Sequence, residues 1–218
     1  MTKGLFITFE GTEGCGKSTQ VELLAQRLRA LGYRVHTLRE PGGTPVGEEI
    51  RHTLKHSKAN VAMTPETELL LMNASRAQLV RETIRPALRA GEIVLCDRFY
   101  DSTTAYQGYG RGLDLALVKS VIDFAIGDTQ PDLTLLLHVT PEVSAERLLA
   151  RQSTLPFIRD RMEEGDRNFF LRVAKGYEAI AAAEPNRVRV VDGSMPIEVV
   201  CAKIWEQAQP MLPRVGRW

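Results

Sequence analysis

The sequence predicts an α/β protein built on a five-stranded parallel sheet with helices on both faces. Short apolar runs alternate with longer segments of helical periodicity, which is the pattern of strand–helix–strand units. Most of the short runs are continuously apolar, as is typical of strands buried on both faces. The chain has 218 residues, of which 44% are hydrophobic and 25% charged, so it can bury a core without disulfides or metals. We expect a single domain over residues 1–218.

Strands are expected where aliphatic and β-branched residues cluster, and helices where apolar residues recur every three or four positions. The expected strands are Leu5–Glu10, Arg34–Leu38, Glu92–Asp97, Leu133–Val139 and Val188–Asp192. The expected helices are Lys17–Leu31, Pro65–Ala90, Leu115–Ile126, Pro141–Arg151, Arg167–Glu184 and Pro196–Gln209. Two irregular polar segments, residues 98–112 and 152–165, are expected to form loops at an active site.

Three helix ends carry recognisable signals. Gly32 follows the first helical segment and is expected to end it. Thr64 precedes Pro65, so the long second helix is expected to begin with a capping threonine and a proline in its first position. Gly91 is expected to end that helix.

The composition excludes several classes of protein. Lys and Arg number 28 and Asp and Glu 27, which leaves a net charge of +1 and no basic excess for coating nucleic acid. No segment has the length and apolar character of a membrane span or of a secretory signal. Three cysteines without a C-x-x-C pair favour a reducing compartment, and four histidines show no metal-ligand spacing. We therefore expect a cytoplasmic protein without a nucleic-acid or membrane partner.

One motif points to chemistry. Residues 11–18 read Gly-Thr-Glu-Gly-Cys-Gly-Lys-Ser, which matches G-x-x-x-x-G-K-[ST] between an expected strand and an expected helix. Such a loop turns its backbone N–H groups onto a phosphate at a helix N-terminus, with Lys17 at the β- and γ-phosphates and Ser18 on Mg²⁺. The alternative is a plain glycine turn before a helix, which the expected strand and helix on either side of the loop disfavour. The motif narrows the fold class to the three-layer P-loop NTPase fold. The expected nucleotide-binding residues are Gly11, Thr12, Glu13, Gly14, Cys15, Gly16, Lys17, Ser18 and Thr19.

Asp97 ends the third expected strand, Ile93–Asp97. An apolar strand that ends in aspartate is typical of the second half of a phosphate-loop site, where the carboxylate supports the metal or its waters. We expect Ser18 and Asp97 to form the metal site. The alternative is an aspartate that caps the next turn.

Four ordered blocks narrow the reaction. They are Glu10–Ser18, Arg39–Thr44 (Arg-Glu-Pro-Gly-Gly-Thr), Asp97–Phe99 (Asp-Arg-Phe) and Ala105–Gly112 (Ala-Tyr-Gln-Gly-Tyr-Gly-Arg-Gly). Their order and spacing, with Arg76 in the long helix and Gln130–Thr134 before the fourth strand, resemble bacterial thymidylate kinases from about residue 5 to about residue 209. The resemblance implies transfer of a phosphoryl group from ATP to dTMP with Mg²⁺, which forms dTDP for dTTP and DNA synthesis. It also implies a homodimer.

The resemblance also implies roles for individual residues. Arg76 and Arg98 are expected to clamp the dTMP phosphate, Glu13 to accept the 3′-hydroxyl, Tyr106 to face C2′ and exclude ribose, and Gln107 to read the thymine edge. The expected acceptor site is Glu13, Arg39, Glu40, Pro41, Met72, Arg76, Arg98, Ser102, Tyr106 and Gln107. Plainer alternatives exist: an ion pair of Arg76 with Glu82, core packing of Tyr106, and a proline–glycine turn at residues 39–42.

The phosphate loop carries Gly14 where some relatives have an arginine, and family members of that kind supply arginines from a lid. The lid is expected at residues 152–165, with Arg151 and Arg161 stabilising transition-state charge and Arg147 near the adenine. Each of these arginines could instead be a solvated surface charge. With Lys17 and Arg98 they make up the expected catalytic set.

One position departs from the family. Met72, four residues before Arg76, stands where an aromatic residue usually stacks on thymine, and Asn73 follows it. A methionine can still cover a base through a sulfur–aromatic contact of about 0.3–1.5 kcal/mol.

Three alternatives to a thymidylate kinase remain open from the sequence. The nearest is a kinase of the same fold that acts on dUMP, another monophosphate or a deoxynucleoside. The second is a nucleotide-binding regulator without turnover, and the third is a nucleic-acid-dependent ATPase. Intact Lys17, Ser18, Asp97 and Arg98 disfavour the second, and the balanced charge disfavours the third.

Overall fold

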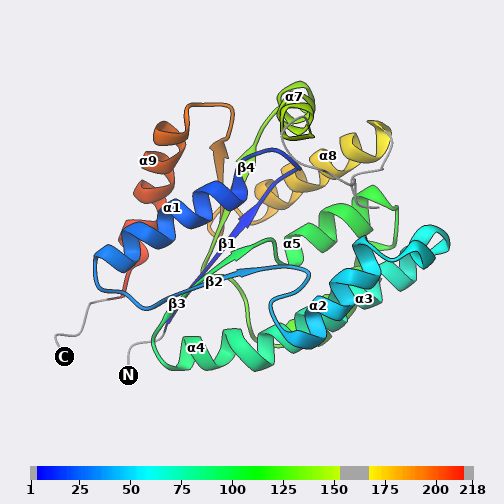
Figure 1. The fold of residues 1–218 in the computed structure, drawn as a ribbon, viewed down its shortest axis with the longest axis horizontal. Helices are drawn as coiled ribbons and strands as arrows, with labels where there is room; N and C mark the ends of the chain where they lie inside the picture. The colour runs from blue at the N-terminus through cyan, green and yellow to red at the C-terminus, as the bar shows by residue number, and fades with distance from the viewer. Residues whose placement is uncertain (1–3, 153–166, 214–218) are drawn as a thin grey trace.

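A computed structural model describes residues 4–152 and 167–213, apart from the side chains of residues 58, 59, 151 and 152. Its centre is a five-stranded sheet in the order β2-β3-β1-β4-β5, and every neighbouring pair is parallel (Figure 1). The strands are β1 Leu5–Glu10, β2 Val35–Arg39, β3 Ile93–Asp97, β4 Leu133–His138 and β5 Val188–Asp192. The predicted strands and the α/β fold class are therefore confirmed. Because all strands run the same way, their carboxyl ends meet at one edge of the sheet, where ligands bind in folds of this type.

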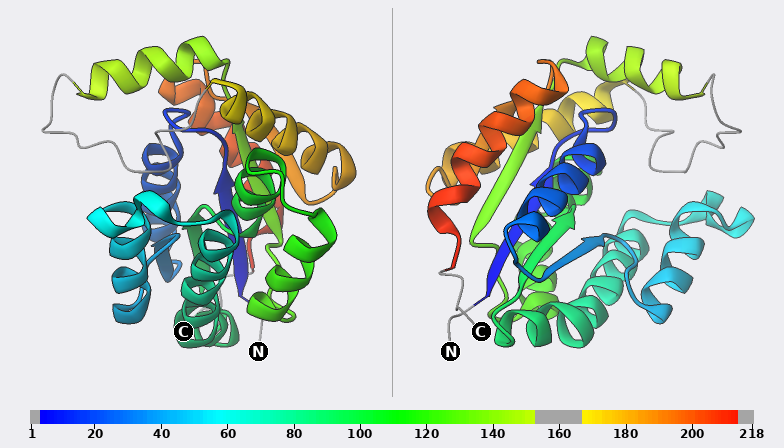
Figure 2. Two further views of the ribbon diagram at one scale, coloured as in Figure 1. Left: turned by 90° about the vertical axis from the view of Figure 1, so that its right-hand side faces the viewer. Right: turned by 60° about the vertical axis from the view of Figure 1, so that its left-hand side comes forward.

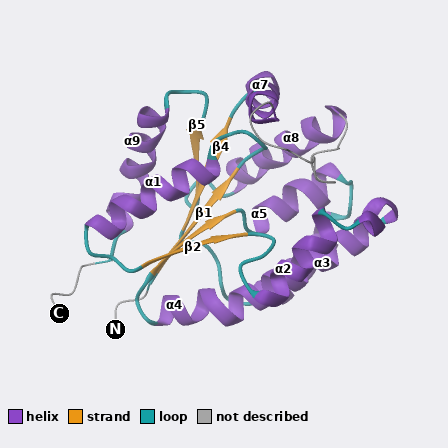
Figure 3. Ribbon diagram, in the orientation of Figure 1, coloured by secondary structure: helices purple, strands orange, loops and turns teal. Residues whose placement is uncertain are grey.

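Helices cover both faces of the sheet (Figures 2 and 3). The helices α1 Lys17–Ala30 and α9 Ile197–Ala208 pack together on one face. The other face carries α3 Pro65–Leu79, α4 Arg85–Arg89, α5 Tyr100–Thr103, α6 Leu115–Ile126 and α8 Arg167–Ala183. The remaining helices are α2 Pro45–Lys55, which follows β2 and packs against α3, and α7 Pro141–Gln152, which follows β4. Within the described ranges, none of the helices is long and apolar enough to cross a membrane.

The alternation of side chains along β1 decides which groups reach the functional face. Ile7 and Phe9 belong to the apolar cluster under α1 and α9, whereas Phe6 belongs to the cluster under α3 and α6. Successive side chains of a strand point to opposite faces. Glu10, the last residue of β1, therefore points to the same face as Phe6, where it is fully buried.

The long helix predicted at Pro65–Ala90 is a continuous helical segment with a change of winding. Thr64 caps it, because its Oγ1 accepts a hydrogen bond of 3.3 Å from the amide of Thr67. A π-helical turn, Val80–Ile84, then joins α3 to α4 just before Pro86. Proline has no N–H to donate and collides with the preceding turn of an α-helix, and the wider turn accommodates it.

The helix α2 was not predicted, although its signals are present in the sequence. Thr44 accepts a hydrogen bond of 3.0 Å from the amide of Gly47, and Pro45 follows as the first helical residue. Ile50 and Leu54 lie four residues apart and pack into an apolar cluster. A capping threonine, a following proline and this spacing were together sufficient to predict the helix.

The prediction of a loop at residues 98–112 is wrong. The segment forms α5 and a π-helical turn, Thr104–Gly110, that packs closely against α8. Its polar residues Ser102, Thr103 and Gln107 are buried. The low helix propensity of this Ser-, Thr- and Gly-rich segment is overridden by burial against α8, which no local pattern reports.

Candidate active site

The phosphate loop joins β1 to α1 at the carboxyl edge of the sheet. Gly11 has φ +135°, and a Cβ atom there would lie 2.3 Å from the carbonyl oxygen of Leu137. Only glycine fits such a close approach of two backbones. Gly16, with φ +97°, then begins α1. The buried ammonium of Lys17 folds back over the loop and donates to the carbonyls of Gly11 (3.1 Å) and Thr12 (2.9 Å).

Ser18 and Asp97 lie side by side, as a metal site requires. The Ser18 hydroxyl donates to Asp97 Oδ2 over 2.6 Å, which brings the start of α1 to the end of β3. Both are oxygen donors of the kind that Mg²⁺ prefers. No group of three acidic, histidine or cysteine side chains that could hold a metal occurs among the described residues. This donor set fits Mg²⁺, which usually binds to one or two protein oxygens together with phosphate oxygens and water.

A wide cleft, which we call the donor cleft after the role expected of the phosphate loop, extends from that loop across the ends of the strands. Residues 13–19 of the loop line it, together with Arg147 and with Gly193, Met195 and Ile197 beyond β5. Gly11 and Thr12 are not among its lining residues. Arg147 donates to the carbonyls of Gly193 (2.9 Å) and Gly14 (3.3 Å), so α7 is fastened to both walls of this donor cleft. Sequence reasoning missed the wall at residues 193–197, because no motif marks it.

A second, smaller pocket adjoins the donor cleft. Its lining residues are Glu13, Glu40, Pro41, Lys55, Met72, Arg76, Arg98, Phe99, Ser102, Thr103, Tyr106 and Gln107. Every residue predicted for the acceptor site lies here except Arg39, which lines the donor cleft and pairs with Glu48 at 3.1 Å. Sequence reasoning missed Lys55, Phe99 and Thr103. Lys55 lies on the unpredicted helix α2, and the other two lie in the segment taken for a loop.

The two pockets meet along a shared wall, and the residues that line both are Glu13, Glu40, Lys55 and Arg98. Arg98 Nη2 lies 2.8 Å from Glu13 Oε1, and Arg98 Nη1 donates to the carbonyl of Gly11 over 3.0 Å. Burial raises the pKa of Glu13, but the charges of Arg98 and Lys17 outweigh it and hold this pKa at about 2. Arg98 also has φ +70°, a strained conformation for a residue with a side chain. The structure therefore fixes an arginine at the junction of the two pockets.

A buried cluster of hydroxyl groups fixes the guanidinium of Arg98 in place. The guanidinium donates to Ser102 Oγ (3.0 Å), to the Tyr177 hydroxyl (3.1 Å) and to the Tyr106 hydroxyl (3.2 Å). Ser102 and Tyr177 in turn donate to Glu10 Oε2, over 2.6 and 3.0 Å. Burial raises the pKa of Glu10 to about 7, helped by nearby Asp101 and opposed by Arg98. Sequence reasoning missed Glu10 and Tyr177, although the position of Glu10 at the end of β1 on the pocket face was a usable signal.

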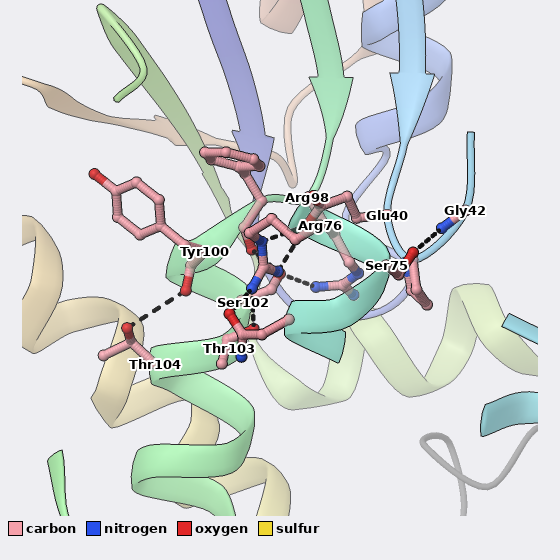
Figure 4. Close-up of polar contacts among 12 residues, drawn as sticks. Glu40, Gly42, Ser75, Arg76, Arg98, Tyr100, Ser102, Thr103 and Thr104 are labelled. Carbon is pink, nitrogen blue, oxygen red and sulfur yellow. Dashed lines mark hydrogen bonds and ion pairs between the residues drawn. The ribbon is translucent and has the colours of Figure 1, made fainter. Parts of the chain in front are cut away.

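Arg76 is buried and faces Glu40 rather than Glu82 (Figure 4). Its Nε donates to Glu40 Oε2 over 2.8 Å, and its Nη2 lies 2.6 Å from the same oxygen. Its other N–H groups reach Asn73 Oδ1, Thr103 Oγ1 and the carbonyl of Phe99, over 2.9, 3.0 and 3.2 Å. The alternative of a surface pair with Glu82 is therefore wrong. The role of Arg76 as a clamp on phosphate stays a prediction, and its guanidinium is here fully engaged by protein acceptors.

Glu40 keeps one oxygen for other partners. Burial raises the pKa of Glu40 to about 7, against the opposing charge of Arg76. Its Oε1 atom is buried and has no hydrogen-bond partner within the described structure. A buried oxygen without a partner is costly in a folded protein, and a ligand donor in the pocket would satisfy it.

Two predicted catalytic residues lie outside the described part of the site. Arg151 belongs to the last turn of α7, but its side chain is not described, and Arg161 lies in the segment 153–166. The predicted lid, residues 152–165, therefore lies outside the described residues apart from the backbone of Gln152.

Comparison with known proteins decides the family. The thymidylate kinase family model matches residues 9–204. The thymidylate kinase of Geobacter sp. (strain M21) is 48% identical over 215 residues, which are 98% of this chain and 95% of that one. The thymidylate kinase of Thermomicrobium roseum is 49% identical over 212 residues, 97% of this chain and 98% of that one. The chain belongs to the thymidylate kinase family. The crystal structure of thymidylate kinase from Ehrlichia chaffeensis, 32% identical, superposes with a TM-score of 0.77 over 95% of this chain and 100% of that chain.

Membership of this family settles the class of the protein. It is a nucleoside monophosphate kinase that phosphorylates dTMP to dTDP with ATP, and the resemblance inferred from the four sequence blocks is confirmed. The alternatives of a regulator without turnover and of a nucleic-acid-dependent ATPase are therefore set aside.

Proposed function

We propose that the smaller pocket binds dTMP, that the donor cleft binds ATP with Mg²⁺, and that the phosphoryl group passes between them beside Arg98. The observation that carries this assignment is the wall that the two pockets share, in which Arg98 is held against the phosphate loop by Glu13 and by the carbonyl of Gly11. Two phosphates that react in line must approach the same positive charge, and Arg98, with Lys55 as a second cation that lines both pockets, supports this path.

Phosphoryl transfer requires that the two phosphates be positioned and their negative charge neutralised, and it requires no general base. The acceptor phosphate is already an anion at neutral pH, so no proton has to be removed before attack. Lys17 lies at the loop that would cradle the donor phosphates, and Arg98 lies between the two sites. Mg²⁺, held through Ser18 and Asp97, would neutralise charge on the donor phosphates. Arg151 and Arg161 are proposed to add charge from the lid.

The pocket walls suit a deoxynucleotide. The Tyr106 ring packs edge-on against Phe169 and Tyr177, and its hydroxyl is held by Arg98, so the ring is fixed in position. A fixed ring against C2′ would collide with a ribose hydroxyl, and Glu13 would accept the 3′-hydroxyl. Met72 is proposed to cover the base and Gln107 to read its edge.

We also propose that the protein is a homodimer. Leu117 and Phe124 of α6 are 52% and 83% exposed, and they lie two helical turns apart on one face of the helix. Helix α3, which packs beside α6, exposes Leu70. Light scattering during gel filtration would give the mass of two chains, and Phe124→Glu would shift it toward one. A wild-type monomer would contradict the proposal.

A reducing, cytoplasmic location is proposed from the thiols. All three cysteines are free, and Cys15 lies within the phosphate loop, where it is buried. Oxidation of Cys15 would distort the loop that binds the nucleotide, so a compartment that keeps thiols reduced fits this chain. We further propose that residues 1–218 act as one domain.

The assignment is tested by ADP release with ATP, Mg²⁺ and a panel of acceptors that includes dTMP, dUMP, dCMP and the ribose form of TMP. We expect the highest kcat/KM with dTMP, and a lower value with the ribose form that rises in Tyr106→Ala. Equal use of the deoxy and ribose forms by the wild type would contradict the pocket assignment. ADP release that no acceptor stimulates would contradict the proposed reaction path.

A further inference from the structure

An ion pair between the buried Glu68 and the partly exposed Arg111 lies next to Gln107. Glu68, on α3, is fully buried and is held by Arg111, whose Nε and Nη2 atoms lie 3.2 and 3.1 Å from Oε1 and Oε2 of Glu68. The guanidinium of Arg111 also lies 4.5 Å from the centre of the Phe169 ring. These contacts fix the carboxylate at both oxygens. Glu68 is not among the residues that line the smaller pocket.

Gln107 bridges this ion pair and the pocket. Its Nε2 atom donates to Glu68 Oε1 over 2.7 Å, and Gln107 itself lines the pocket while being 1% exposed. An amide has a donor end and an acceptor end, and the hydrogen-bonding network decides which end faces which way. A carboxylate paired with an arginine only accepts hydrogen bonds. The nitrogen end of Gln107 must therefore face Glu68, which leaves the Oε1 acceptor for a ligand.

We propose that Glu68 and Arg111 are positioning residues that lock the Gln107 amide so that its oxygen faces the base, and thereby select acceptors with a ring N3–H. The inference rests on the proposed role of Gln107 in reading the base. Thymine and uracil carry a donor at N3, whereas cytosine carries an acceptor there. A locked oxygen therefore meets a donor in dTMP and a second acceptor in dCMP. A free amide would turn over and accommodate both.

The position of Glu68 supports this role over a purely structural one. Glu68, Met72 and Arg76 recur every four residues along α3, so they share one face of the helix. The last two line the pocket, and the first reaches it only through Gln107. An ion pair between a buried carboxylate and a partly exposed arginine adds little net stability compared with apolar residues of similar size, so its arrangement beside the pocket calls for another reason.

The test is the ratio of kcat/KM for dCMP to that for dTMP, which a loss of stability alone does not change. Glu68→Gln offers Gln107 a partner that can donate or accept, so the amide can turn. We expect the dCMP to dTMP ratio to rise about tenfold, which corresponds to one buried hydrogen bond gained or lost. Glu66→Gln makes the same chemical change at an exposed position of the same helix and should leave the ratio unchanged.

An exchange of the two side chains adds a rescue. Glu68→Gln combined with Gln107→Glu places a carboxylate at 107, which can only accept from the base, and an amide at 68 that can donate to it. We expect the dCMP to dTMP ratio to return toward the wild-type value. A Glu68→Gln variant that folds and keeps the wild-type ratio would overturn the inference.

One further variant separates this inference from the role of Gln107 on which it rests. If Gln107→Met raises the ratio and Glu68→Gln does not, Gln107 reads the base but Glu68 does not orient it. If Gln107→Met leaves the ratio unchanged, the role of Gln107 itself is wrong.

Discussion

The donor cleft and the smaller pocket adjoin each other, yet they are built in different ways. We call the smaller pocket the acceptor pocket after its proposed role. The end of the donor cleft proposed to bind phosphate is lined by one continuous stretch of chain, residues 13–19, within a loop whose shape depends on the backbone of its glycines. The acceptor pocket takes its side chains from the phosphate loop, from the segments that follow β2 and β3, and from α2, α3, α5 and the π-helical turn after α5. Its side chains are held by buried networks around Glu10, Glu40 and Glu68. Backbone geometry therefore makes one site and side-chain packing the other.

This difference predicts how each site fails. In the donor cleft the ammonium of Lys17 is proposed to supply the charge at the phosphate loop itself, so its loss should be severe. In the acceptor pocket several groups hold each contact residue, so the loss of one contact weakens the function without removing it.

The largest effect is expected in the donor cleft. Lys17→Ala removes the ammonium that would reach the donor phosphates, and kcat should fall by about a hundred- to a thousandfold. The thermal unfolding midpoint should stay close to that of the wild type, because the glycine loop remains. Lys203→Ala, at an exposed position of α9, is the matched control and should have no effect on kcat. A Lys17→Ala variant with nearly normal turnover would show that the donor cleft does not depend on the charge of Lys17.

Glu10, behind the acceptor pocket, should make the free energy of unfolding depend on pH between about pH 4.5 and 7. The pKa of Glu10 is raised to about 7, so the folded state holds a proton that the unfolded chain releases near pH 4.5. The stabilisation is therefore complete below pH 4.5 and is lost as the pH rises through 7. Glu10→Gln keeps the neutral form, so its free energy of unfolding relative to the wild type should rise by up to about 3 kcal/mol between pH 5 and 8.

Urea unfolding at both pH values would measure this change. Glu49→Gln, at an exposed position, should show the same change in the free energy of unfolding between the two pH values as the wild type. If Glu10→Gln also shows the wild-type change, Glu10 does not titrate in this window. Glu40, whose pKa is also about 7, is unchanged in all three proteins and contributes equally to each.

A smaller effect is expected from Tyr177, which touches Arg98 but lines neither pocket. Tyr177→Phe removes the hydroxyl that bonds to Arg98, Ser102 and Glu10. The lost bond to Arg98 is the one that bears on the proposed reaction path, and its loss should lower kcat about five- to tenfold. The KM for ATP should change little, because Lys17 and the loop are untouched. Tyr33→Phe, whose hydroxyl bonds to the Pro213 carbonyl far from the site, is the control. A change in the KM for ATP without a change in kcat would contradict the positioning role.

The smallest effect is expected at Met72, which lines the acceptor pocket and is 9% exposed. Met72→Phe would replace an adaptable contact by a rigid ring, and the KM for dTMP should fall about threefold while that for ATP stays the same. Met211→Phe, the same change at a methionine that is exposed and lines neither pocket, is the control. Weaker dTMP binding in Met72→Phe would show that the pocket has no room for a stacking ring.

The sequence determined the elements whose signals are local. The five strands, the phosphate loop and most helix ends were predictable, because burial on both faces, glycine conformation and capping each act over a few residues. The helix α2 was predictable by the same rules and was overlooked. The membership of Arg98, Tyr106 and Gln107 in one site came from the order of the motif blocks, and the structure then placed them around one pocket.

Tertiary structure alone decided the contacts between distant segments. The pairing of Arg76 with Glu40 joins residues 36 positions apart, and that of Glu10 with Tyr177 joins residues 167 apart. Neither pair belongs to a periodic pattern or a motif, because hydrogen bonds between buried groups depend on which elements pack together and not on sequence spacing. The helical form of residues 100–110 has the same origin, since α8, far along the chain, supplies the surface that buries it. The backbone loop for phosphate could thus be predicted locally, whereas the network that orients the acceptor site exists only once the sheet and its helices have assembled.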